Sequence, residues 1–229
     1  MKNILLLGAT GSIGESVLSV INENKSKLNL FGISLNNNLN IANKIIDDFN
    51  PSFVYIEDKD TFDNQKESKE VIYLNGDEEL KGLINHHDVD IIISAISGFA
   101  GLKATHLAAS SGKKILLANK ESIVAGGDLI LPLAKENNSE IIPIDSEHNA
   151  IFQCLSGEKG IDDVKRVTIT ASGGPFINKK LLDLKNVKKS DALNHPNWKM
   201  GSKISIDSAT LVNKCLELIE AKYLFDLDE

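Results

Sequence analysis

Acidic side chains stand at a short, regular spacing in the second half of this 229-residue chain. Asp145 and Glu147 flank Ser146 directly after the apolar run 141–144. In an extended segment, residues two apart point to one side, so the two carboxylates would form a pair suited to Mg²⁺ or Mn²⁺. The alternative is a helix start, where Asp, Ser and Glu act as capping residues. The triplet alone favours the helix start.

A third acidic residue, Glu217, follows Asn213 by four positions and Lys214 by three. At these spacings the three side chains share one face of a helix. The ordinary explanation is an exposed ion pair between Lys214 and Glu217, which is common and contributes little to stability. Taken in isolation, the pattern favours that ordinary explanation over a ligand site.

Three glycines, Gly8, Gly11 and Gly14, follow the apolar run 4–7 and open an amphipathic stretch. A dinucleotide site needs this arrangement, because the turn must be tight, the backbone must approach a pyrophosphate, and a helix N-terminus must supply free N–H groups. The strand–turn–helix context makes a dinucleotide-binding turn the preferred interpretation, ahead of a merely structural turn.

The second predicted strand ends at Leu35 and is followed by Asn36, Asn37 and Asn38. An NAD-binding protein usually places Asp or Glu there for the ribose, and the absence of both favours NADP. No arginine is present to meet a 2′-phosphate, and asparagines also suit a turn, so that alternative stays open.

Short apolar runs alternate with amphipathic stretches as far as about residue 144. This alternation predicts an α/β fold, with a Rossmann-like, doubly wound parallel sheet in residues 1–144. The predicted strands are 3–7, 28–35, 52–56, 71–74, 90–94, 114–117 and 140–144. The predicted helices between them include 12–23, 41–49, 101–111 and 128–138.

The pattern changes in residues 145–229, for which we predict an α+β catalytic domain that is incomplete. A helix is expected at 150–155, a strand at 164–171, an irregular segment at 173–203 and a final helix at 208–225. At the end of the predicted strand, Ser172-Gly173-Gly174 fits an anion-binding nest or a plain turn equally well. The loop 194–201 contains His195 and the single tryptophan, Trp198, and suits a lid over a substrate.

Polar residues at the carboxyl ends of parallel strands face the ligand cleft of such folds. Asn119, Lys120 and Glu121 follow the strand predicted at 114–117, so a site role is favoured over a solvated surface. His86, His87, His106 and His148 show no ligand spacing.

Composition excludes several classes of function. The net charge is −7, whereas a nucleic-acid-binding protein normally has a basic face. No apolar run is long enough to span a bilayer, and the N-terminus reads as a strand because its apolar stretch breaks at Gly8. Cys154 and Cys215 have no metal or redox spacing. We therefore expect a cytoplasmic protein without nucleic-acid or membrane partners.

Six runs together resemble the 1-deoxy-D-xylulose 5-phosphate reductoisomerase family: GATGSIG, LANKES, PIDSEHNAIFQCL, ITASGGPF, NHPNWKMG and DSATLVNKCLELIEA. They occur in order over almost the whole chain, and this resemblance reverses the local preference for capping residues and a surface ion pair. It implies Mg²⁺ or Mn²⁺ at Asp145, Glu147 and Glu217. It implies NADPH binding by Thr10, Gly11, Ser12, Ile13, Asn36, Asn37, Asn38, Asn119, Glu121 and Gly201.

The resemblance also implies a small phosphorylated sugar as substrate. The implied substrate contacts are Lys120, Ser146, Glu147, Ser172, His195, Ser208, Asn213, Lys214 and Glu217. Among these, the resemblance gives the phosphate to Ser172, Ser208, Asn213 and Lys214, with Trp198 on the lid. The implied catalytic residues are Lys120, Asp145, Glu147, His195 and Glu217.

The implied activity is the NADPH- and divalent-metal-dependent isomerisation and reduction of 1-deoxy-D-xylulose 5-phosphate to 2-C-methyl-D-erythritol 4-phosphate, a step toward isoprenoid precursors. The alternatives are another NADP-dependent reductase and a non-catalytic dinucleotide sensor. Family chains are homodimers that continue past Glu229 into a helical domain, so we expect this chain to be a fragment. Asn36 stands where the family usually has glycine.

Overall fold

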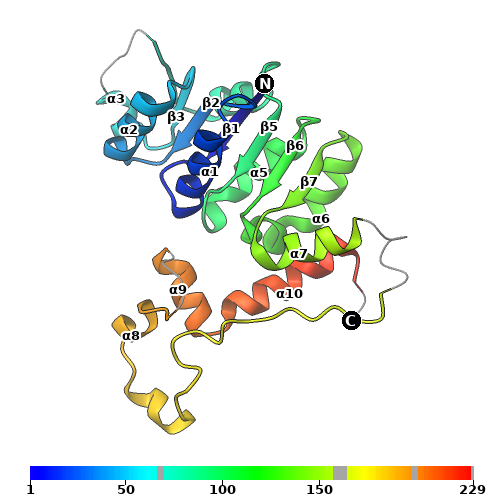
Figure 1. Cartoon of the computed structure of the whole chain (residues 1–229). Coiled ribbons are helices and arrows are strands. Elements are labelled where there is room, and N and C mark those ends of the chain that lie inside the picture. The colour runs from blue at the N-terminus through cyan, green and yellow to red at the C-terminus, as the bar shows by residue number, and fades with distance from the viewer. Residues whose placement is uncertain (66–69, 157–163, 197–200, 228–229) are drawn as a thin grey trace. The chain divides into compact units, whose positions relative to one another are not determined.

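The computed structural model describes residues 1–65, 70–156, 164–196 and 201–227 (Figure 1). Its residues fall into two compact units, Met1–Asp145 and Ser146–Glu229. Each unit has its own set of elements.

The first unit is built on a seven-stranded sheet in which all adjacent strands are parallel. The strand order is β4-β3-β2-β1-β5-β6-β7, so the direction of winding changes between β1 and β5. The strands are β1 (Lys2–Leu7), β2 (Leu28–Leu35), β3 (Phe53–Ile56), β4 (Ile72–Leu74), β5 (Ile91–Ser94), β6 (Lys114–Leu117) and β7 (Glu140–Pro143).

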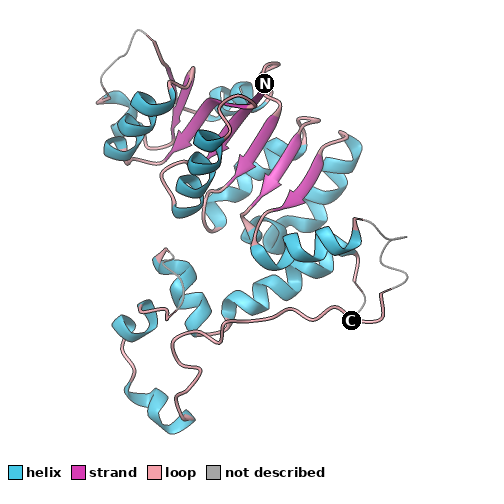
Figure 2. Ribbon diagram, viewed as in Figure 1, coloured by secondary structure: helices cyan, strands magenta, loops and turns pink. Residues whose placement is uncertain are grey.

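Helices cover both faces of this sheet (Figure 2). They are α1 (Ser12–Glu23), α2 (Leu39–Phe49), α3 (Lys59–Asp63), α4 (Asp77–Ile84), α5 (Leu102–Ala109) and α6 (Lys120–Glu136), with a 3₁₀ turn η1 (Phe99–Gly101) before α5. In β1, Ile4 and Leu6 pack into the core under α1 and α2, whereas Leu5 and Leu7 pack into the core under α4 and α5. This two-sided burial explains the continuous apolar run and confirms the predicted α/β fold.

Two features of the first unit differ from the prediction. Helix α6 begins at Lys120 rather than at Asp128, because the side chain of Asn119 caps it by accepting from the backbone N–H of Ser122 at 2.8 Å. A non-helical residue, Gly126, and an internal proline, Pro132, interrupt the apolar periodicity of α6 and hide its first turns from a pattern search. Helix α4 was not predicted either.

The described part of the second unit is helical, with α7 (Ser146–Leu155), η3 (Leu181–Asn186), α8 (Lys189–Leu193), α9 (Ser202–Ala209) and α10 (Val212–Phe225). The strand predicted at 164–171 is wrong, since these residues pair with no strand in the described part of the unit. The helix predicted at 208–225 is confirmed from Val212 to its end at Phe225, but its predicted start is wrong: Leu211 adopts φ 62°, a left-handed conformation that separates α9 from α10. Among the described helices, none has the length and apolar character needed to cross a membrane.

Gly14 offers a test of the packing between α1 and β1. A Cβ atom at this position would overlap the backbone carbonyl of Ala9, so we predict that Gly14→Ala lowers the free energy of unfolding by roughly 2 kcal/mol or more. Urea denaturation of the variant and the unsubstituted protein measures this loss.

Gly82 supplies the matched control, because it lies within α4 and a Cβ there meets no heavy atom within 4 Å. Gly82→Ala should leave stability unchanged or raise it by about 0.5–1 kcal/mol, as alanine restricts the unfolded chain. Equal effects of the two substitutions would contradict the packing argument.

Candidate functional site

The turn after β1 brings the backbone of the first unit close to the point where the sheet changes direction. Gly8 has φ 88°, and a Cβ there would lie 2.7 Å from the carbonyl of Ala95, just past β5. The backbone N–H of Gly8 donates to Ser34 Oγ at 3.0 Å, and that of Ala9 donates to the Ser34 carbonyl at 2.9 Å. This switch point is where open α/β sheets bind their ligands.

The start of α1 follows this turn directly. Gly11 precedes the helix, and among the described residues no side chain caps it. Gly11 and Ser12 are exposed, whereas Thr10 and Ile13 are partly buried. Backbone N–H groups at an uncapped helix start, together with the helix dipole, suit an anionic phosphate.

The three asparagines after β2 are exposed, but they are not equivalent. The Oδ1 atom of Asn38 accepts from the backbone N–H of Ile41 at 3.2 Å and caps α2. The carbonyl of Asn36 accepts from the backbone N–H of Asp58 at 3.2 Å. Asn38 therefore fits the turn interpretation, while the side chains of Asn36 and Asn37 face solvent beside the end of β2.

Asn119 is 2% exposed and connects two loops at the carboxyl ends of β5 and β6. Its Nδ2 atom donates to the carbonyl of Ile96 at 2.6 Å and to that of Gly98 at 2.9 Å, while Oδ1 caps α6. Glu121 Oε2 lies 3.2 Å from the same nitrogen. The side chain of Asn119 thus fixes the 96–98 loop against α6.

Lys120 and Asp145 form an ion pair within the first unit, with Nζ 3.9 Å from Oδ2. Both side chains are mostly buried, at 14% and 13% exposed. Lys120 starts α6, and Asp145 ends the unit just after β7. The ammonium of Lys120 and the carboxylate of Asp145 are thereby held at the carboxyl edge of the sheet.

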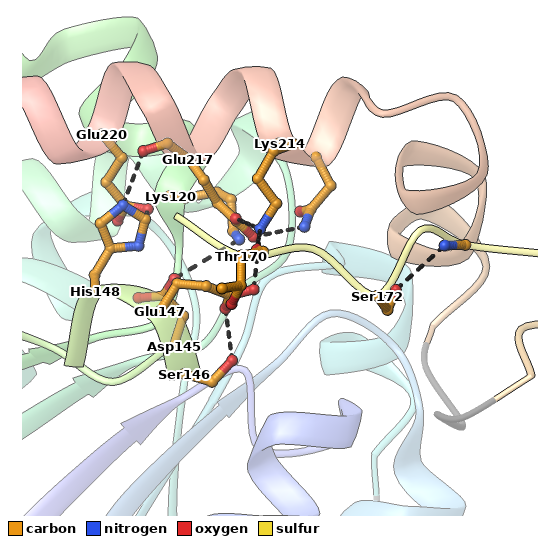
Figure 3. Close-up of polar contacts among 12 residues, drawn as sticks. Lys120, Asp145, Ser146, Glu147, His148, Thr170, Ser172, Lys214, Glu217 and Glu220 are labelled. Carbon is orange, nitrogen blue, oxygen red and sulfur yellow. Dashed lines mark hydrogen bonds and ion pairs between the residues drawn. The ribbon is translucent and has the colours of Figure 1, made fainter. Parts of the chain in front are cut away.

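The helix-start interpretation of the Asp-Ser-Glu triplet is correct in its local structure, because α7 begins at Ser146. Glu147 Oε2 accepts from Ser146 Oγ at 2.5 Å, and Oε1 accepts from Lys214 Nζ at 3.0 Å (Figure 3). The same Lys214 ammonium also contacts Glu217 Oε2 and donates to the Thr170 carbonyl at 2.5 Å.

Glu217 does not form the exposed ion pair that its sequence pattern favoured. Its side chain is 1% exposed, and Asn213 Nδ2 donates to its Oε1 at 2.6 Å. Carboxylate oxygens of Glu147 and Glu217 lie within 4.8 Å of one another, so α7 and α10 each contribute one acidic group to one place. This carboxylate pair, with Lys214 between its members, is the acidic centre of the second unit.

Two groups at the acidic centre, Glu147 and Lys214, have shifted pKa values. Burial alone would raise the pKa of Glu147, but the hydrogen bonds from Ser146 and Lys214 and the charge of Lys214 lower it below its usual value. Burial alone would lower the pKa of Lys214, but the hydrogen bonds to Glu217 and Glu147 raise it above its usual value. Glu147 is therefore ionised at neutral pH, and Lys214 is cationic.

The remaining predicted substrate residues of the second unit lie on the segments around α9. Ser172 Oγ lies 3.0 Å from His195 Nε2 and accepts from the backbone N–H of Gly174 at 3.3 Å. A Cβ on Gly174 would lie 2.9 Å from the Ser208 carbonyl, which shows how closely this turn approaches α9. Gly201 is the residue before α9 and is exposed. Trp198, the predicted lid residue, falls outside the described residues.

Two further residues of the second unit, His148 and Glu220, were not predicted as functional. His148, which showed no ligand spacing, is fully buried and contacts α10 through the carboxylate of Glu220 and the backbone carbonyl of Glu217. Glu220 follows Glu217 by three positions, so the sequence does predict that these two residues share one face of a helix. The contact between Glu220 and His148 could not be predicted from the sequence, because the two residues lie far apart in the chain.

These features define the class: an α/β protein with the glycine turn of a dinucleotide-binding sheet and a second unit that gathers carboxylates in one place. Residues 4–127 match the family model for 1-deoxy-D-xylulose 5-phosphate reductoisomerase, and residues 141–225 match the model for the C-terminal domain of that enzyme. The chain belongs to the 1-deoxy-D-xylulose 5-phosphate reductoisomerase family.

Curated relatives and solved structures agree with this assignment. The 1-deoxy-D-xylulose 5-phosphate reductoisomerases of Clostridium tetani and Thermoanaerobacter sp. are 48% and 45% identical over all of this chain, which spans 60% of each of them. A crystal structure of DOX-P reductoisomerase with NADPH, fosmidomycin and magnesium is 41% identical, with a TM-score of 0.92 over 100% of this chain and 59% of that one. The Zymomonas mobilis enzyme with NADPH is 38% identical, with a TM-score of 0.87 over 99% of this chain and 59% of its own.

The role of Asn119 as a connector leads to a prediction. Asn119→Ala removes the cap of α6 and the side-chain donor to the partly buried carbonyls of Ile96 and Gly98, so the free energy of unfolding should fall by about 2–3 kcal/mol. Urea denaturation followed by circular dichroism measures it.

The matched control is Asn137→Ala at the other end of α6, where Asn137 Nδ2 donates only to the Leu133 carbonyl within the same helix. Its loss should be below about 1 kcal/mol. An Asn119→Ala variant as stable as the control would show that Asn119 does not hold the 96–98 loop.

Proposed function

We propose that this chain carries the cofactor-binding and catalytic residues of a 1-deoxy-D-xylulose 5-phosphate reductoisomerase, which converts its substrate to 2-C-methyl-D-erythritol 4-phosphate with NADPH and Mg²⁺ or Mn²⁺. The chain spans about 60% of the length of the curated relatives it matches. The observation that supports the proposal most directly is the acidic centre, in which two carboxylates from distant parts of the chain meet around one ammonium group.

NADPH fits the first unit. The uncapped start of α1 at Thr10, Gly11, Ser12 and Ile13 suits the pyrophosphate, and Asn36 and Asn37 offer uncharged amides beside the end of β2. Residues 36–38 include no Asp or Glu of the kind that binds the ribose of NAD, which favours a 2′-phosphate. Asn119 supports this site through the 96–98 loop, while Glu121 and Gly201 complete the proposed set.

The donors of the acidic centre fit a divalent cation, because carboxylate oxygens are the ligands that Mg²⁺ and Mn²⁺ prefer. The ammonium of Lys214 between Glu147 and Glu217 shows that this place stabilises positive charge. We assign Glu147, Glu217 and Asp145 as the ligands, Asp145 being joined to Glu147 through Ser146. The bound ion would polarise the substrate's ketone and hydroxyl oxygens as a Lewis acid.

Protein side chains bind and orient the substrate in this proposal. Ser172, Ser208, Asn213 and Lys214 hold its phosphate, which supplies binding energy remote from the reacting carbons. Ser146, His195 and Lys120 contact the sugar portion. The hydrogen bond between His195 Nε2 and Ser172 Oγ gives these two residues a fixed separation of 3.0 Å. A cytoplasmic location and a homodimer with a second copy remain predictions.

The test measures NADPH oxidation with 1-deoxy-D-xylulose 5-phosphate and Mn²⁺ in the intact protein. We predict that excess chelator abolishes turnover and that Glu217→Gln lowers kcat/KM at least about 100-fold, because the substitution removes a charged ligand without changing its shape. Binding of NADPH should survive both changes.

Glu140→Gln is the control, because Glu140 pairs with Lys114 in an exposed ion pair on β6 and β7. It should retain full activity. Turnover that persists in chelator would indicate a metal-independent reductase, and NADPH binding without any oxidation would indicate a dinucleotide sensor. Either result overturns the proposal.

A further inference from the structure

A buried histidine and a buried glutamate connect α7 to α10 behind the acidic centre. His148 Nδ1 lies 3.3 Å from Glu220 Oε2, and His148 Nε2 lies 2.9 Å from the backbone carbonyl oxygen of Glu217. The side chains of His148 and Glu220 are 0% and 1% exposed. Figure 3 shows the His148 ring pointing from α7 toward α10, on the side away from Ser146.

The hydrogen-bond chemistry of this contact fixes the ring. A carbonyl oxygen only accepts, so Nε2 of His148 carries a hydrogen and donates it to the Glu217 carbonyl. Nδ1, the other ring nitrogen, then faces the Glu220 carboxylate at the distance of an ion pair. The ring is therefore held by a hydrogen bond at Nε2 and lies against a carboxylate at Nδ1, and its plane lies nearly parallel to that of Phe225 at 8°.

The same contact fixes the two helices that carry the acidic centre. His148 follows Glu147 on α7, and its partners on α10 are Glu220 and the backbone of Glu217 itself. A shift of α10 along or around its axis would separate Glu220 from the ring and leave a carboxylate buried without that partner, which costs free energy. The contact thus opposes movements that would change the spacing between the Glu147 and Glu217 carboxylates.

We propose that His148 and Glu220 form a positioning pair, which holds the backbone of Glu217 so that its carboxylate and that of Glu147 are spaced to bind one divalent cation. The proposal rests on the metal site put forward under the proposed function. The pair acts through the ligands and does not itself touch the ion. Partners that orient metal ligands typically change metal affinity by about 10- to 100-fold when they are removed.

Direct Mn²⁺ binding, followed by electron paramagnetic resonance in the intact protein, tests the pair independently of turnover. We expect the Mn²⁺ dissociation constant to rise about 10-fold or more in His148→Ala and Glu220→Ala. In His148→Gln, an amide N–H can still donate to the Glu217 carbonyl, and in Glu220→Gln the side chain can still hydrogen-bond the ring. These conservative variants should recover part of the affinity.

Two controls separate positioning from general stability. His106→Ala and Glu78→Gln change exposed residues of α5 and α4 and should leave Mn²⁺ affinity unchanged. Thermal unfolding of each variant shows whether it is folded at the temperature of the titration. A double-mutant cycle between His148→Gln and Glu220→Gln should give effects on Mn²⁺ affinity that are not additive, because the two side chains form one contact.

Each outcome of these measurements either supports or overturns the positioning role of His148 and Glu220. Folded variants with unchanged Mn²⁺ affinity and lowered melting temperatures would overturn the positioning role and leave a purely structural one. Failure of all four variants to fold would overturn it in the same way. An unsubstituted protein that binds no Mn²⁺ would overturn the proposed metal site and this pair with it, whereas normal binding with unaffected variants overturns the pair alone.

Discussion

The compensation of buried negative charge is the constraint on which the second unit depends. Glu217 and Glu220 are each 1% exposed on one helix, and a buried carboxylate is tolerated only when hydrogen bonds or opposite charge surround it. Asn213 and Lys214 contact the Glu217 carboxylate from the same helix, and His148 contacts the Glu220 carboxylate from α7. The proposed cation ligand Glu217 thus lies beside residues that make its burial possible.

In the first unit, the groups suited to a charged ligand come from the backbone instead of from side chains. A phosphate-bearing ligand needs N–H donors and close approach of the backbone. The uncapped start of α1 offers such N–H groups, and glycine at position 8 lets the turn before it lie against Ala95, whose carbonyl a Cβ would strike. Ser34 holds the turn from β2, and Asn119 holds the neighbouring 96–98 loop from α6. The glycine motif is therefore only one part of a site built by three strand ends.

Elements that depend on local sequence patterns were predicted more closely than elements that depend on contacts between distant residues. Strands β2 and β6 were predicted to the residue, because burial on both faces leaves a continuous apolar run. The start of α6 was missed because the Asn119 cap decides where the helix begins, and the non-helical Gly126 interrupts the apolar periodicity of its first turns. The strand predicted at 164–171 failed because strand formation needs a partner, which apolar character alone does not supply.

By itself the sequence determined the α/β class, the glycine turn and the residue types able to hold a dinucleotide and a cation, since these follow from local periodicity and from motifs of a few residues. Only the tertiary structure decided that Glu217 is buried rather than exposed, that Lys214 joins it to Glu147, and that His148 reaches α10. These contacts link positions 67 and 69 residues apart. Local pattern carries no information about such pairs, because their energy arises only when packing removes both helices' inner faces from water.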